Sequence, residues 1–172
     1  MPKIMLHNSD ARRALARGVF RLAAAVEPTL GPKGMNAMID RPIGTPMVTR
    51  DGVSIASEIE LHDRFENMGA QVVREVSMQT NEIAGDGTTT AIVLANALIQ
   101  GGVEANERGV KSVDLCKGID LAVAAVVAAL KASAKPAKGN GILASVANIA
   151  ATNAKLGALV AEAHQRVGIE GV

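Results

Sequence analysis

The sequence has very few aromatic residues and a single cysteine. It contains two phenylalanines but no tryptophan or tyrosine, so it offers almost no surface on which nucleic-acid bases could stack. The net charge of +1 provides no electrostatic attraction for nucleic acid or for an acidic membrane surface. Cys116 cannot form an internal disulfide, which favours a reducing compartment. These scarcities predict a protein that binds neither nucleic acid nor membrane.

Long apolar runs are also missing. The longest one, residues 121–130, lies between Asp120 and Lys131 and is shorter than the roughly 20 residues that a membrane-spanning helix needs. Near the N-terminus only residues 4–6 are apolar, too few for a signal peptide. Hydrophobic residues make up 48% of the chain and charged residues 20%, a balance typical of globular proteins. We therefore expect a cytoplasmic globular protein.

Several familiar site patterns are absent from the sequence. No G-x-x-x-x-G-K-[ST] pattern occurs, which excludes a Walker-type phosphate loop. Gly85 and Gly87 begin like a dinucleotide fingerprint, but the third glycine is missing and a helix-like segment stands where a strand is needed. His7, His62 and His164 lie far apart and lack the clustered spacing of zinc ligands.

Apolar residues recur at steps of three and four along most of the chain, a period typical of helices. This pattern predicts helices over residues 10–27, 63–83, 89–107, 113–132, 142–151 and 154–167. Two short strands are predicted at residues 38–39 and 47–49, on either side of a proline-bearing connection over residues 42–46. Residues 3–6 form a further extended candidate that needs a partner strand, whereas the period of residues 53–61 is ambiguous.

Four of these helices have predicted buried faces. The apolar side of the first comprises Leu15, Val19, Leu22 and Val26. Either Ser9 or Asp10 can cap its start. The apolar side of the second comprises Phe65, Met68, Val72 and Val76. The helices at residues 89–107 and 113–132 are apolar nearly all round, which predicts burial in the core.

The stretch from Gly85 to Thr90 carries the densest chemistry in the chain. Gly85 and Gly87 allow a ligand to approach the backbone, and Asp86 is a hard carboxylate of the kind that holds Mg²⁺ with water and phosphate oxygens. The threonines after Gly87 open a helix, whose unpaired N–H groups attract anions. The stretch therefore predicts a phosphate and metal site. A glycine-rich connection with threonine caps would have the same composition, so both interpretations stay open.

Two more loops, residues 29–34 and 50–52, are also short, polar and glycine-bearing. Each adjoins an element with a predicted buried face. If the loops converge with residues 85–90, they form a phosphate pocket with Asp86 on the metal and Asp51 near the attacking water or the metal. Spacing along the chain does not determine whether they converge.

These three loops and the sequence Phe65-Glu66-Asn67-Met68-Gly69-Ala70 resemble the group I chaperonins of the GroEL type, in order and in spacing. The resemblance covers the whole chain and is strongest over residues 10–99. It implies a mostly α fold with a small β component. Residues 1–133 would be the N-terminal part of an ATP-binding equatorial domain, and residues 134–172 the ascending part of an intermediate domain. The change to small and turn-forming residues over 132–141 agrees with that boundary.

The resemblance also implies the roles of individual residues. The implied nucleotide contacts are Thr29, Leu30, Gly31, Pro32, Arg50, Asp86, Gly87, Thr88, Thr89, Thr90 and Ile149. Asp86 would hold the metal ion, and Asp51 would assist ATP hydrolysis as the catalytic carboxylate. Arg50 stands where the family usually has lysine, a difference that keeps the charge but not the shape.

The function implied is that of an ATP-dependent protein-folding chaperonin subunit. Its cofactors would be ATP or ADP with Mg²⁺, and K⁺ is a further candidate. Its partners would be like subunits in a ring, and a co-chaperonin lid and unfolded polypeptide that bind an apical domain absent from this chain. We expect the chain alone to be incomplete and inactive. The alternative is a non-catalytic truncated remnant that keeps the fold and an interaction surface, and sequence beyond Val172 would discriminate between the two.

Overall fold

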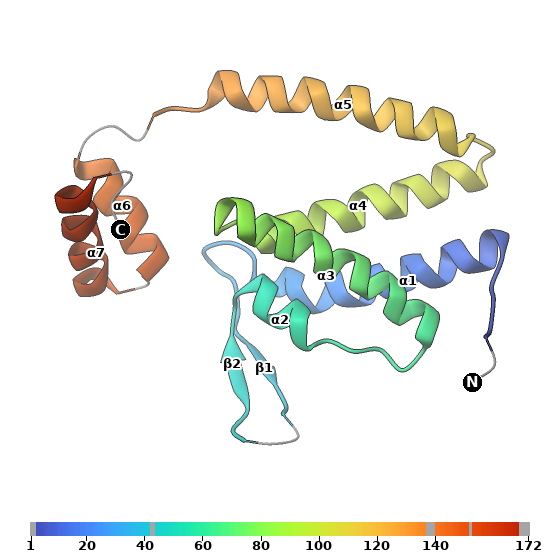
Figure 1. The fold of residues 1–172 in the computed structure, drawn as a ribbon, viewed down its shortest axis with the longest axis horizontal. Helices are drawn as coiled ribbons and strands as arrows, with labels where there is room; N and C mark the ends of the chain where they lie inside the picture. Colours follow the sequence, from blue (N-terminus) through green and yellow to red (C-terminus); the bar gives the residue numbers. More distant parts are fainter. Residues whose placement is uncertain (1–2, 42–43, 137–139, 152, 169–172) are drawn as a thin grey trace. The chain divides into compact units, whose positions relative to one another are not determined.

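The computed structural model describes residues 3–41, 44–136, 140–151 and 153–168 (Figure 1). The described residues are 74% helical with one small sheet, so the predicted mostly α fold with a small β component is confirmed. The elements in chain order are α1 (Asn8–Val26), the 3-10 helix η1 (Glu27–Thr29), β1 (Ala37–Ile39), β2 (Met47–Thr49), α2 (Gly52–Glu58), α3 (Arg64–Ala84), α4 (Thr88–Glu107), α5 (Ser112–Ser133), α6 (Asn140–Ala151) and α7 (Ala154–Val167). They fall into two compact units, Met1–Gly118 and Ile119–Val172. The predicted domain boundary after residue 133 stays a prediction.

The core of the first unit lies among α1, α2, α3 and α4. Its buried side chains are Val19, Leu22, Ala23, Val26, Ile55, Ala56, Ala70, Val73 and Ile92. The predicted apolar face of α1 is confirmed at Val19, Leu22 and Val26, whereas Leu15 is partly exposed at the edge of that face. Full burial of each such side chain stabilises the fold by about 1.5–3 kcal/mol, so this face fixes α1 in place.

Helices α1 and α3 cross with their backbones in close contact. A Cβ atom added at Gly18 would lie 1.8 Å from the carbonyl oxygen of Glu66, and one added at Gly69 would lie 2.0 Å from the carbonyl oxygen of Leu15. Real Cβ atoms do not approach backbone oxygens so closely. Each helix therefore contributes a glycine that lets the other come near.

This close crossing makes the predicted buried face of α3 wrong at Met68 and Val72, which are 53% and 55% exposed. The other two predicted residues, Phe65 and Val76, are half-buried. The buried side instead comprises Glu66, Gly69, Ala70, Val73 and Ser77. Small residues occupy the buried face of α3 because they allow α1 to approach closely. The larger apolar side chains lie next to that face.

Glu66 links the two helices by charge as well. Its Oε1 accepts a hydrogen bond of 2.9 Å from Arg17 Nε, and its Oε2 lies 2.9 Å from Arg21 Nη1 as an ion pair without hydrogen-bond geometry. The Glu66 side chain is buried, but both arginines are more than half exposed. Because the arginines stay largely solvated, each pair contributes at most about 1 kcal/mol.

The period of residues 53–61 is ambiguous in the sequence, and in the structure residues 53–58 of this stretch belong to helix α2. The sheet is a two-stranded antiparallel hairpin in which Met38 pairs with Val48, which confirms the two predicted strands. Residues 42–43 of their connection lie outside the described residues. The predicted extended stretch at residues 3–6 forms no strand. The predicted cap of α1 is also wrong, because α1 begins at Asn8 after His7, with no side-chain hydrogen bond at its start.

In the described structure the predicted burial of the two apolar helices is confirmed in α4 for one side alone, where Ile92 is in the core and Ile99 packs against it, and it is wrong for α5. In α4 only Thr88 and Ile92 are buried, and Leu94 and Leu98 are more than half exposed. No residue of α5 is buried. The physical reason is that α1, α2 and α3 cover α4 on one side, whereas a helix that is apolar all round needs neighbours on several sides.

The second unit contains the helical hairpin of α6 and α7. Their contact is tight, since a Cβ atom added at Gly157 would lie 2.1 Å from Asn148 Oδ1. Asn153 caps α7, and its Oδ1 accepts hydrogen bonds from the N–H groups of Lys155 and Leu156 at 2.9 and 3.4 Å. Helix α7 has the bounds that the sequence predicts, and residues 137–139 and 152 lie outside the described residues.

Candidate functional site

The turn between α3 and α4 is built from two glycines around an aspartate. Gly85 ends α3 with φ = 65°, and Gly87 precedes α4 with φ = 79°, a region that side chains with a Cβ rarely adopt. Between them Asp86 is exposed, and its Oδ1 accepts a hydrogen bond of 2.7 Å from the N–H of Gly87. The glycines make the reversal possible and leave a carboxylate on the surface.

Helix α4 begins without a side-chain cap. Its first backbone bond runs from the N–H of Ala91 to the carbonyl of Gly87, and no side chain of the described residues accepts a hydrogen bond from its first turn. Thr88 is buried, Thr89 half-buried and Thr90 exposed. The threonines therefore do not cap α4, but the glycine-rich connection of the alternative interpretation is present at Gly85 and Gly87. The N–H groups of a first helical turn have no partner inside the helix, so they can receive an anion.

The loop before α2 holds the other predicted carboxylate. Asp51 caps α2, and its Oδ2 accepts hydrogen bonds from the N–H and the hydroxyl of Ser54, at 3.0 and 2.5 Å. The N–H of Asp51 donates to Thr49 Oγ1 at 3.1 Å, which fixes the exit from β2. Arg50, between these residues, is exposed. The expected turn at residues 50–52 is therefore the start of a helix.

The starts of α2 and α4 touch each other. A Cβ atom added at Gly52 would lie 2.4 Å from Thr89 Oγ1, 2.8 Å from Thr89 N and 3.0 Å from Thr88 Oγ1. The loop that carries Asp51 therefore lies directly against the helix that Asp86 precedes.

The loop after η1 also adjoins α4. Thr29 is buried and its hydroxyl donates to the carbonyl of Val26 at 2.7 Å, so any ligand contact of Thr29 would involve its backbone. Gly31 has φ = 78° and its carbonyl accepts from the N–H of Gly34 at 2.9 Å. Leu30 and Pro32 are exposed beside it. Because η1 and α2 both contact α4, the three loops gather at one end of the first unit (Figure 1).

Ile149 lies on α6 in the second unit, where it is 79% exposed. Its contact with a nucleotide stays a prediction.

Among the described residues, no group of three or more His, Cys, Asp and Glu side chains could hold a metal ion. The metal-binding role of Asp86 stays a prediction; a Mg²⁺ ion held by one carboxylate would take its other ligands from phosphate oxygens and water.

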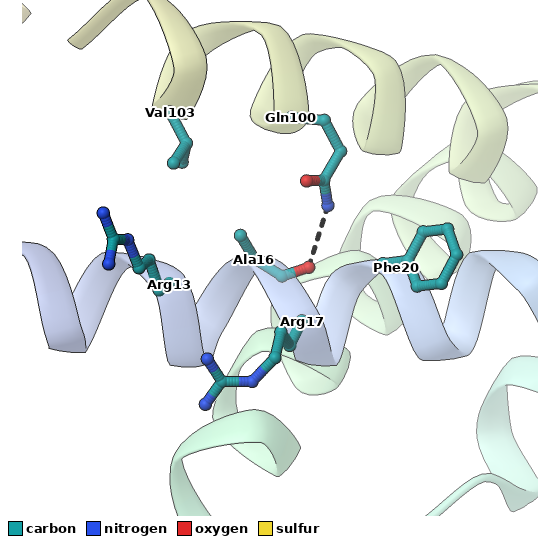
Figure 2. Close-up of a pocket in the computed structure, with 6 residues that line it drawn as sticks. All are labelled: Arg13, Ala16, Arg17, Phe20, Gln100 and Val103. Carbon is teal, nitrogen blue, oxygen red and sulfur yellow. Dashed lines mark hydrogen bonds between the residues drawn. The ribbon is translucent and has the colours of Figure 1, made fainter. Parts of the chain in front are cut away.

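A groove of about 350 Å³ between α1 and α4 contains none of the predicted site residues (Figure 2). Its lining residues are Arg13, Ala16, Arg17, Phe20, Gln100 and Val103. Gln100 Nε2 donates to the carbonyl of Ala16 at 2.9 Å across it. At its end, the hydrogen bond from Arg13 Nε to Glu107 Oε1 raises the pKa of the guanidinium. The groove thus belongs to the packing of α1 on α4.

No helix in the described part of the chain has the length and apolar character needed to cross a membrane.

Sequence reasoning missed two residues that shape this region, Gly52 and Ser54. The spacing of Asp51 and Ser54, three residues apart, was an available signal, because a cap and the third helical residue commonly exchange hydrogen bonds. No local sequence signal indicated the role of Gly52, since the residues that it contacts, Thr88 and Thr89, belong to α4.

Comparison with known proteins identifies the fold. Residues 22–170 match the model of the TCP-1/cpn60 chaperonin family. The chain belongs to this family. It is 72% identical over 172 residues to Chaperonin GroEL 4 of Bradyrhizobium diazoefficiens, and the match covers all of this chain and 32% of that protein, its N-terminal part. The predicted resemblance to GroEL-type chaperonins is therefore confirmed.

A solved structure agrees with this assignment. The crystal structure of a group III chaperonin in the open state matches with a TM-score of 0.75 and 30% identity, over 91% of this chain and 32% of the other. The chain thus spans about a third of the length of both chaperonin relatives.

Proposed function

We propose that this chain is the N-terminal, nucleotide-binding part of an ATP-dependent protein-folding chaperonin subunit. The observation that carries the proposal is the contact of Gly52 with Thr88 and Thr89, which brings two aspartate-bearing loops to one uncapped helix start. Membership in the chaperonin family and the identity to GroEL 4 support it.

The residues around the start of α4 suit a nucleoside triphosphate. The uncapped N–H groups of α4 would bind phosphate oxygens, and Gly85 and Gly87 place no side chain in the way. ATP with Mg²⁺ supplies the transferable phosphoryl group and the neutralising cation. Asp86 would hold the cation, and Asp51 would orient the attacking water.

The remaining predicted contacts complete this proposal. The backbone of Thr29, Leu30, Gly31 and Pro32 would line the nucleotide, and Ile149 would give it an apolar contact. Arg50 would place positive charge beside the phosphates, with K⁺ as a further candidate ion. Ring assembly with like subunits, and binding of a co-chaperonin lid and unfolded polypeptide in a cytoplasmic setting, would belong to the longer protein.

The test uses a hybrid subunit, in which this chain replaces the matched N-terminal third of GroEL 4. We expect the hybrid to hydrolyse ATP with Mg²⁺ and K⁺, and Asp86→Ala to abolish Mg-ADP binding in titration calorimetry, because Mg²⁺ depends on one or two protein carboxylates. Asp114→Ala is the matched control, since Asp114 is an exposed acid in the first turn of α5. Unchanged affinity in Asp86→Ala would overturn the phosphate site. A hybrid that assembles but does not turn over ATP would favour the non-catalytic remnant.

A further inference from the structure

Ser54 makes a contact with Asp51 that a helix cap does not require. The bond from the Ser54 N–H to Asp51 Oδ2, 3.0 Å long, is the ordinary capping bond of α2. The Ser54 hydroxyl adds a second hydrogen bond to the same oxygen at 2.5 Å. Hydroxyl bonds to an ionised carboxylate typically have this short length, and they are roughly twice as strong as bonds between neutral groups.

Both bonds fall on Oδ2, which leaves the other oxygen available. In the described part of the chain, Asp51 Oδ1 accepts no hydrogen bond and joins no ion pair. Two donors from one helical residue fix the rotation of the carboxylate, because turning it would break both bonds. The carboxylate thus has one oxygen held by α2 and one oxygen that can face a water or a metal ion.

The next serine of α2 shows that this contact is specific to Ser54. The hydroxyl of Ser57 donates to the carbonyl of Val53 at 2.8 Å, inside the helix, and does not reach Asp51. Ser57 is therefore a matched control: it is the same residue type on the same helix, without the contact.

We propose that Ser54 is a positioning residue for Asp51: its hydroxyl holds Oδ2 so that Oδ1 accepts a hydrogen bond from the attacking water. The inference rests on the proposed function, in which Asp51 assists ATP hydrolysis. Ser54 itself touches neither nucleotide nor water in this arrangement. Its removal should therefore change the rate of the chemical step more than the binding of ATP.

The experiment measures kcat, KM for ATP and the thermal midpoint of the hybrid subunit and its variants. Ser54→Ala keeps the backbone cap and removes one exposed hydrogen bond, so we expect an unchanged KM and a midpoint lowered by no more than a few degrees. We expect kcat to fall about 10- to 100-fold, the loss that follows when a reacting group is misplaced. Ser54→Thr keeps the hydroxyl and should restore kcat to within about twofold. Ser57→Ala should leave kcat unchanged.

A purely structural role gives a different pattern, and that pattern would overturn the inference. In that case Ser54→Ala lowers the midpoint by many degrees with a parallel fall in kcat, or leaves kcat at the parent value, or is not rescued by Ser54→Thr. Asp51→Asn, in which asparagine caps a helix as well as aspartate does, separates this result from the proposed function. Full turnover in Asp51→Asn would refute the catalytic role of Asp51. If instead Asp51→Asn is inactive while Ser54→Ala is fully active, only the inference about Ser54 fails.

Discussion

Replacing Gly52 with alanine tests the contact between the starts of α2 and α4. Gly52 has no positive φ, so alanine would suit its backbone, and the better helix propensity alone would stabilise α2 by up to about 1 kcal/mol. The added Cβ, however, would meet Thr89 Oγ1 at 2.4 Å and Thr89 N at 2.8 Å. The backbone nitrogen cannot rotate away as a side chain could, so one helix start must move.

The clash should outweigh the gain in propensity. Overpacking of this kind costs about 1–3 kcal/mol against a propensity gain of up to about 1 kcal/mol, so we expect a net loss of up to about 2 kcal/mol in the free energy of unfolding. A shift of α2 also separates Asp51 from the start of α4, and a displacement of about 1 Å in a site can cost about 100-fold in rate. We therefore expect a large fall in ATP turnover of the hybrid subunit, up to about 100-fold, together with only a modest fall in its free energy of unfolding.

Gly101→Ala is the matched control. Gly101 lies in α4 itself, and a Cβ there would have no neighbour within 4 Å among the residues that the structure describes. This substitution should raise the free energy of unfolding by about 0.5–1 kcal/mol and leave turnover unchanged. Urea unfolding and phosphate release measured on both variants decide the matter. If Gly52→Ala proved as stable and as active as Gly101→Ala, the two helix starts would not form one site.

Three further predictions concern charge, burial and completeness. Arg50→Lys should leave ATP turnover of the hybrid subunit nearly unchanged and Arg50→Glu should reduce it, because a carboxylate beside phosphate repels it; parent turnover in the glutamate variant would show that this side chain does not face the site. Ser77 is fully buried and its hydroxyl has no hydrogen-bond partner among the described residues, so Ser77→Ala should raise the free energy of unfolding by about 1 kcal/mol in urea titration, and a loss instead would reveal a hidden partner. The isolated chain should form soluble aggregates or a loosely packed state without ATPase activity, because α4 and α5 expose apolar side chains. Size exclusion with light scattering and a phosphate-release assay test this. A ring-sized oligomer with steady phosphate release would contradict it.

The positions of the helices could be predicted from the sequence because their signals are local. The three- and four-residue period of apolar side chains placed α4 and α7 within a residue of their observed bounds. The start of α2 was harder, since the helix depends on a single cap from Asp51 and not on a long period.

The buried face of α3 could not be predicted from its own sequence. Apolarity favoured Met68 and Val72, but the packing of α1 selected Gly69 and Ala70. That choice depends on Gly18, which lies in another helix, so a pattern within α3 cannot reveal it. The same limit applies to the site. The chemistry of residues 85–90 and of Asp51 could be predicted from the residues, and the other contacts of the loops from the family resemblance. The contact of Gly52 with Thr89, by contrast, exists only once α2 and α4 have folded against each other.

The crossing of α1 and α3 restricts how this protein can vary over evolution. In most helix contacts a larger side chain on one partner can be accommodated by a smaller one on the other, so sequences drift by paired changes. At Gly18 and Gly69 the facing atom is a backbone carbonyl oxygen, of Glu66 and of Leu15 respectively. No substitution can make a carbonyl smaller, so no second-site change compensates for a side chain at either glycine. A side chain at either position would therefore force α1 and α3 apart, and with α3 it would move the turn around Asp86.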